Sequence, residues 1–153
     1  MTERRLWIRL GLFAVAFPNV VNGVWMLVDP IGWYRGFPGL GRHWASVFGP
    51  FNHHLVVDAG AGFLAIGVLV VIALVWARRE VIIAALAAAL VHALPHFLYH
   101  VTHRPAGLGA SDAVMSAASL GLVIGAAVIC LIAVTSSRSV EDDSMRIGER
   151  VTT

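Results

Sequence analysis

The residues best suited to chemistry in this sequence are its histidines. They gather in two segments, FNHHLVVDAG at 51–60 and HALPHFLYHVTH at 92–103, and of the seven only His43 lies outside both. Neutral imidazole is the commonest metal ligand in proteins and also transfers protons near neutral pH. Asp58, in the first segment, adds a hard anionic oxygen ligand. The two segments therefore predict a site that binds a metal ion or moves protons.

The spacing of these residues is helical. His54 and Asp58 are four positions apart, and the second segment steps by four, four and three through His92, His96, His100 and His103. Residues three or four positions apart share one face of an α-helix. Each segment therefore predicts one polar stripe along one helix.

The elements that carry the stripes are expected to span a membrane. The chain is 58% hydrophobic and 13% charged, with a mean hydropathy of +0.79. A helix needs about 20 mostly apolar residues to cross a bilayer, and four segments qualify, at about 6–28, 55–76, 81–101 and 113–134. We predict an all-α fold, an antiparallel four-helix transmembrane bundle formed by residues 1–134. The polar tail at 135–153 is expected to be disordered and cytoplasmic.

Arginines near the helix ends predict the orientation. One side of the bundle carries Arg4, Arg5, Arg9, Arg78, Arg79, Arg138, Arg146 and Arg150, and the other side carries Arg35, Arg42 and Arg104. The positive-inside rule then places both termini in the cytoplasm, in a multi-pass protein of the plasma membrane. The partner implied is the lipid bilayer, with a homo-oligomer or a larger membrane complex also open. The scattered arginines do not favour nucleic-acid binding.

Both histidine segments are expected at the outer end of the bundle. The short ARRE link at 77–80 predicts an antiparallel hairpin, in which Asp58 comes level with His100 and His54 level with His103. We therefore expect the two stripes to meet in an outward-facing pocket above an apolar floor. The predicted metal ligands are His54, Asp58, His96, His100 and His103. The predicted catalytic residues, which would relay protons or orient a ligand, are Tyr99 and His92. The aromatic loop at 29–50 either caps this pocket or anchors the chain at the interface.

Three stretches also carry a resemblance. DPIGWYRGFPGLGRHW, GPFNHHLVVDAGAGFLAIG and LPHFLYHVTH resemble a group of four-helix membrane proteins of actinobacteria. In that group an aromatic-FPG loop, a GP-[FY]-N-x-H-x3-D-x-G segment and a PH-x2-YH-x2-H segment recur. The resemblance covers roughly residues 28 to 103. More distantly, the architecture is similar to that of DoxX-like small membrane proteins. The resemblance implies the same four-helix fold but no particular reaction. The positions that fit are Phe37, Pro38, Gly39, Gly49, Pro50, Asn52, His54, Asp58, Gly60, Pro95, His96, Tyr99, His100 and His103, whereas His53 and His92 depart from the pattern.

Three functions are compatible with these residues. The first is a membrane oxidoreductase or hydrolase that acts on a lipid-like substrate with a bound divalent metal, zinc or iron. The second is an electron carrier with non-covalent haem, held by axial imidazoles such as His54 and His100. The third is a non-catalytic accessory subunit whose polar cluster fixes helix packing.

Overall fold

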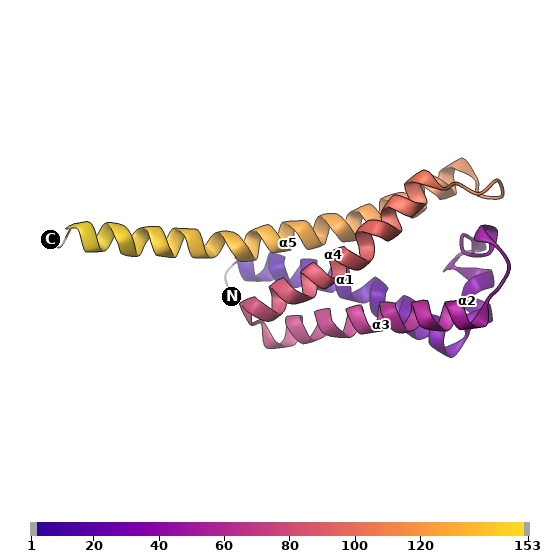
Figure 1. Cartoon of the computed structure of the whole chain (residues 1–153), viewed down its shortest axis with the longest axis horizontal. Coiled ribbons are helices and arrows are strands. Elements are labelled where there is room, and N and C mark those ends of the chain that lie inside the picture. The colour runs from indigo at the N-terminus through magenta and orange to yellow at the C-terminus, as the bar shows by residue number, and fades with distance from the viewer. Residues whose placement is uncertain (1–2, 152–153) are drawn as a thin grey trace.

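The computed structural model consists of helices, a short hairpin and connecting loops (Figure 1). It describes residues 3–136 in full and the backbone of helix α5 as far as residue 151. The elements are α1 (Glu3–Val28), α2 (Pro30–Gly36), β1 (Pro38–Gly39), β2 (Arg42–His43), a 3-10 turn (Ser46–Phe48), α3 (His53–Trp76), α4 (Arg79–Thr102) and α5 (Ala110–Val151). The tail at 135–153 was predicted to be disordered. All of it except Thr135 and Ser136 lies outside the fully described part of the chain.

Four of these helices are long and apolar enough to cross a membrane. They are α1, α3, α4 and the Ala110–Ser136 part of α5. The four predicted spans are therefore confirmed, each with ends within a few residues of those expected. The chain is an all-α, multi-pass membrane protein whose long helices form a bundle.

The connection between α3 and α4 explains why these two helices run antiparallel. Helix α3 ends at Trp76, Ala77 takes the left-handed backbone conformation that commonly terminates helices, and α4 begins at Arg79. At its other end, the Asn52 side chain accepts a 3.0 Å hydrogen bond from the Leu55 amide and caps α3. The hairpin predicted from the ARRE link is thus present.

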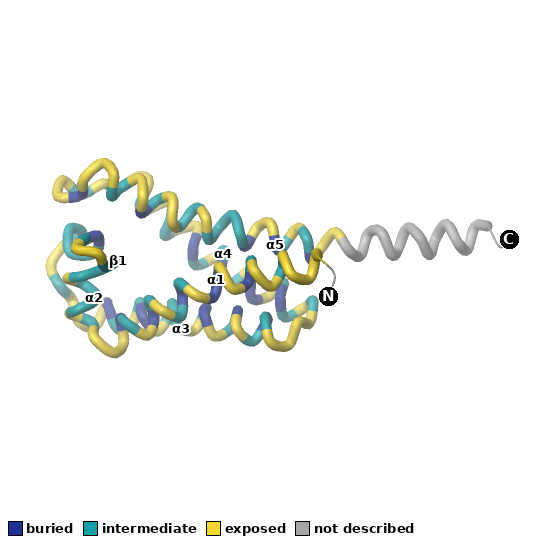
Figure 2. The backbone as a smooth tube through the Cα atoms, turned by 180° about the vertical axis from the view of Figure 1, so that it is seen from behind, coloured by how far each residue is buried: buried dark blue, intermediate teal, exposed yellow. Residues whose placement is uncertain are grey.

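Helices α1 and α3 pack with their backbones in close contact. A Cβ atom added to Gly23 would lie 2.5 Å from the Leu64 nitrogen, and one added to Gly67 would lie 2.8 Å from the Val20 nitrogen. Small residues allow this approach, which is a common way for helices to associate in membranes. The buried apolar core continues from this contact towards the end that holds the N-terminus (Figure 2).

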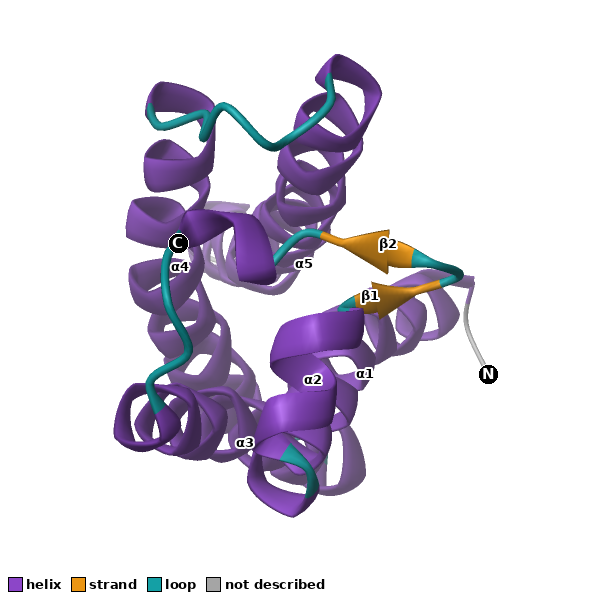
Figure 3. Ribbon diagram, turned by 90° about the vertical axis from the view of Figure 1, so that its right-hand side faces the viewer, coloured by secondary structure: helices purple, strands orange, loops and turns teal. Residues whose placement is uncertain are grey.

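The loop between α1 and α3 is folded. Asp29 caps α2 by accepting a 2.9 Å hydrogen bond from the Gly32 amide, and Pro30 occupies the first helical position. The β1–β2 hairpin follows and lies between α2 and α5 (Figure 3). An ion pair between Arg42 and Asp112 joins the hairpin to the start of α5. The loop is therefore attached to both sides of the bundle.

Candidate functional site

A cavity of about 190 Å³ lies in the half of the bundle nearest this loop. Every long helix and the loop contribute to its wall, so residues far apart in sequence meet there. From the bundle come Asn19 and Asn22 of α1, Phe63 of α3, the imidazoles of α4, and Ser116 and Ser119 of α5. The rest of the wall is apolar, with aromatic rings from the loop and small or aliphatic side chains from the helices.

The loop residues cover the cavity with a layer of rings. Trp33, Phe37, Trp44 and Phe48 all line it. Trp33 packs on Phe37 with ring centroids 5.3 Å apart, and Phe37 meets the edge of Trp44 at 5.9 Å. Such offset and edge contacts are favourable between aromatic rings. The loop therefore covers the cavity, and its role as an anchor at the membrane interface stays a prediction.

The imidazoles of α4 form a hydrogen-bonded chain with α5. The Nε2 atoms of His96 and His100 lie 3.0 Å apart, and the Nδ1 atom of His100 lies 3.2 Å from the Ser116 hydroxyl oxygen. A neutral imidazole has one donor and one acceptor nitrogen. The chain can therefore run in either direction, from Ser116 to His96 or the reverse, with the tautomer of His100 changing between the two. This arrangement can transfer a proton along the cavity wall.

Two buried polar atoms in this wall have no hydrogen-bond partner among the described residues. They are the indole Nε1 of Trp44 and the Nε2 of His92. Trp44 is only 6% exposed, and its indole nitrogen can act only as a donor. By contrast, the indole nitrogen of Trp33 donates to the Asn22 side-chain oxygen at 3.2 Å. A buried donor without an acceptor is unfavourable, so the cavity suits a molecule that supplies one.

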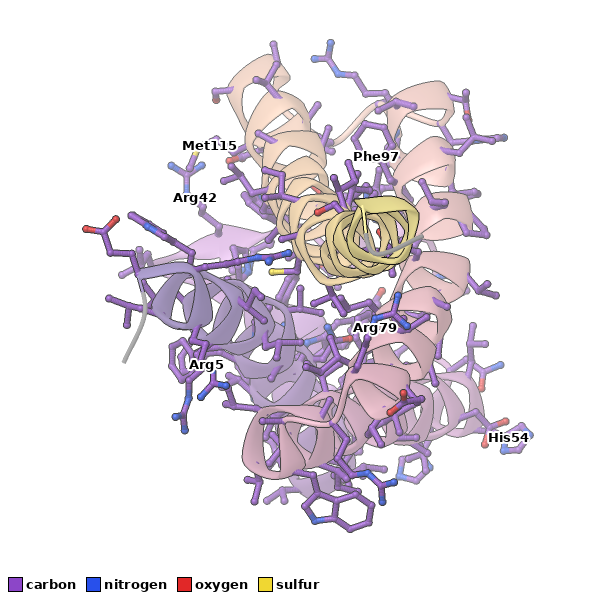
Figure 4. All side chains as sticks on the ribbon, turned by 90° about the vertical axis from the view of Figure 1, so that its left-hand side faces the viewer. Arg5, Arg42, His54, Arg79, Phe97 and Met115 are labelled. Atoms are coloured by element: carbon purple, nitrogen blue, oxygen red, sulfur yellow. The ribbon has the colours of Figure 1, made fainter. Side chains whose placement is uncertain are left out.

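The expectation that the two polar stripes meet is wrong. The His54 and Asp58 side chains approach each other at 3.2 Å, as their spacing predicts, but they are 87% and 60% exposed. Figure 4 shows His54 projecting away from the bundle. The reason is rotational, because the face of α3 that packs against α1 carries Gly60 and Gly67, and Asp58 lies on the other side of the helix. Residues on α3 and α4 that lie at the same depth therefore need not point towards each other.

The other predicted residues divide between the cavity and the surface. His92, His96 and His100 line the cavity. Tyr99 and His103 are exposed and stack on each other, with ring centroids 4.5 Å apart, outside the cavity. Among the described residues, no group of three or more histidine, cysteine, aspartate or glutamate side chains is arranged to hold a metal. The five predicted metal ligands are therefore not brought together.

Sequence reasoning missed the residues that give the cavity its shape. Phe63 was not singled out, and Trp44 was considered only as part of the aromatic loop at 29–50 and not as a residue of the cavity wall. Phe63 meets the edge of the His92 ring with centroids 4.7 Å apart, a contact that no spacing rule indicates. Its position depends on how α3 turns towards α4.

Comparison with protein families, with characterised proteins and with solved structures finds no match to this chain. The assignment to the multi-pass membrane class therefore rests on the four apolar helices. Function has to be argued from the cavity itself.

Proposed function

We propose that this protein binds an amphipathic, lipid-like molecule in the cavity, with the polar head of that molecule facing Trp44 and His92. The single observation that carries the proposal is the pair of buried, partnerless polar atoms in an otherwise largely aromatic and apolar wall. Small-molecule sites commonly combine an apolar lining with a few convergent polar groups. The indole donor requires an acceptor on the ligand, such as a carbonyl or ether oxygen.

The chemistry supported at this site is proton transfer to or from the ligand head. His96 and His100 belong to the hydrogen-bonded chain that reaches Ser116, and His92 stands one turn further along the same face of α4. Imidazole can accept a proton at one ring nitrogen and release one from the other. Proton transfer is a component of both the oxidoreductase and the hydrolase considered from the sequence. We therefore propose that the protein is an enzyme that transfers a proton to or from the molecule bound in the cavity.

The binding proposal is tested by measuring what the purified protein retains. The wild type in detergent should carry an apolar compound, close to one per chain, extractable with organic solvent and quantified by mass spectrometry. Trp44→Phe leaves a smaller aromatic ring and removes the N–H, so we expect retention to weaken by about three- to tenfold. His92→Phe should act in the same direction.

Trp76→Phe is the matched control because Trp76 is exposed at the other end of α3 and lines no part of this cavity. It should retain as much compound as the wild type. A wild type that retains nothing, or equal losses from Trp44→Phe and Trp76→Phe, would contradict the proposal.

A divalent metal is a second candidate, favoured by the convergence of two Nε2 atoms 3.0 Å apart on α4. Catalytic zinc sites use three protein ligands, so the described residues supply one ligand too few. Haem is less well supported, because His54 points away from His100 and the cavity.

Metal content distinguishes this second candidate. If the imidazole pair binds zinc or iron, His96→Ala and His100→Ala should remove most of the metal from the purified protein. Occupancy should also fall on acidification, because only neutral imidazole coordinates metal. His54→Ala and Asp58→Ala should leave the content unchanged. A wild type without stoichiometric metal would exclude this candidate, and equal losses from all four variants would restore the site expected from the sequence.

A further inference from the structure

A second recess lies at the opposite end of the bundle, where the N-terminus and the α3–α4 turn come together (Figure 1). Its volume is about 610 Å³. Four arginines line it, Arg4, Arg5 and Arg9 from α1 and Arg79 from α4. Figure 4 looks onto this end and labels Arg5 and Arg79. No aspartate or glutamate is among the described residues that line the recess, so its wall carries a concentrated positive charge.

Backbone contacts hold two of these guanidinium groups against α5. The Arg79 Nε atom donates to the Val134 carbonyl at 3.2 Å, and the Arg4 side chain donates to the Ala133 carbonyl. Within the described residues, Arg5 and Arg9 make no ion pair or hydrogen bond. The recess therefore combines two oriented arginines with two that are available to a ligand.

The α4 helix begins at Arg79, which lines the recess. No side-chain hydrogen bond caps its first turn, which also carries Glu80 outside the lining of the recess. Uncapped amides at a helix N-terminus carry partial positive charge. Arginine is also the side chain best suited to phosphate, because its planar group donates two parallel hydrogen bonds. The recess is thus chemically matched to a phosphate-bearing anion.

The floor of the recess indicates what kind of phosphate it takes. It is formed by apolar side chains, Ile8, Leu12, Ala73, Leu74, Ile82 and Val134. Trp7, Val75 and Trp76 are exposed on the neighbouring turns of α1 and α3, as expected for residues in contact with the membrane interface. A free phosphate ion would gain nothing from such a floor, whereas an acyl chain would. We propose that this recess binds an anionic phospholipid, with its headgroup phosphate on the arginines and its chain against the floor.

This site does not depend on the function proposed for the cavity. Basic pockets between transmembrane helices on the cytoplasmic side are suited to anionic headgroups. The arginine distribution predicts that this end is cytoplasmic, which is the leaflet where such lipids are concentrated.

The test uses the full chain purified in detergent and titrated with phosphatidylglycerol or phosphatidylcholine, with bound lipid measured by native mass spectrometry. The wild type should bind phosphatidylglycerol at least about tenfold more tightly than phosphatidylcholine. The double variant Arg5→Gln/Arg9→Gln should lose about tenfold in affinity for phosphatidylglycerol, because two phosphate-binding groups are removed. Its thermal unfolding should stay unchanged, since neither side chain is bonded to the described residues.

Arg78→Gln is the matched control, because Arg78 adjoins Arg79 but does not line the recess. It should bind like the wild type. Excess inorganic phosphate should displace little lipid. Equal affinity for the two lipids, an unaffected double variant, an equal loss in Arg78→Gln, or complete displacement by phosphate would each overturn the proposal.

Discussion

His100 makes a hydrogen bond with each of its ring nitrogens, one within its own helix and one to the neighbouring helix. Its Nε2 faces His96 on the same helix, and its Nδ1 faces Ser116 on α5. Phe48 of the loop meets the edge of the same ring, with centroids 5.0 Å apart. One imidazole therefore connects α4, α5 and the loop. This contact is also what an accessory subunit would need if the polar cluster only fixed helix packing.

Removing the Ser116 hydroxyl should measure the strength of that link. Ser116→Ala should lower the free energy of unfolding in detergent by about 0.5–1.5 kcal/mol, the usual net contribution of a hydrogen bond. Ser119→Ala is the control, because its hydroxyl donates at 2.8 Å to the Ser116 carbonyl within the same helix. It should cost less. If the two variants were equally stable, the bond between α4 and α5 would contribute nothing.

At the scale of elements, the packing of α1 on α3 decides which side of α3 faces the bundle. Gly60 and Gly67 lie on the packed face, and a Cβ at Gly60 would come within 2.6 Å of the Met26 Cβ. Phe63 is carried towards the cavity by the same rotation, while His54 is carried outwards. The glycine contacts therefore position the site although they do not line it.

A larger residue at this contact should separate the two helices. In Gly67→Val the new side chain would meet the Val20 side chain at 2.7 Å and its backbone nitrogen at 2.8 Å. Overpacking of this kind typically costs about 1–3 kcal/mol. Gly62→Val is a matched control on the same helix, because a Cβ there has nothing within 4 Å. Chemical unfolding in detergent would compare them, and equal stability would show that the contact is dispensable.

At the scale of the whole molecule, the bundle has two chemically different ends. The loop end holds the histidine-lined cavity and the other end holds the arginine-lined recess. Between them lies an apolar core that includes Leu12, Val15, Val70 and Leu86. A protein with this polarity should insert in one orientation only, with the arginine-rich end in the cytoplasm.

Labelling of single cysteines in intact cells would test that orientation. In a Cys130→Ala background, His103→Cys should react with a membrane-impermeant reagent added outside, because His103 lies at the loop end beyond α4. Arg78→Cys, at the other end of α4, should react only after the cells are permeabilised. The reverse pattern would invert the proposed topology.

The sequence by itself determined the membrane class, the four spans and the helical stripe of His92, His96 and His100. These features depend on hydropathy and on residue spacing along one helix, and both are local properties of the chain. The short α3–α4 connection likewise followed from its length. For the same reason, the close spacing of His54 and Asp58 was predicted correctly.

Only the tertiary structure decided that the two polar stripes do not face each other and which other residues line the cavity with the α4 histidines. The direction of His54 and Asp58 depends on the rotation of α3, which the glycine contacts with α1 impose from another part of the chain. The cavity depends on Trp44 and Phe63, brought beside α4 by a folded loop and by that rotation. The depth of a residue in the membrane follows from its position along its helix. The direction in which its side chain points follows from how that helix packs against others, and the sequence of one helix does not contain that information.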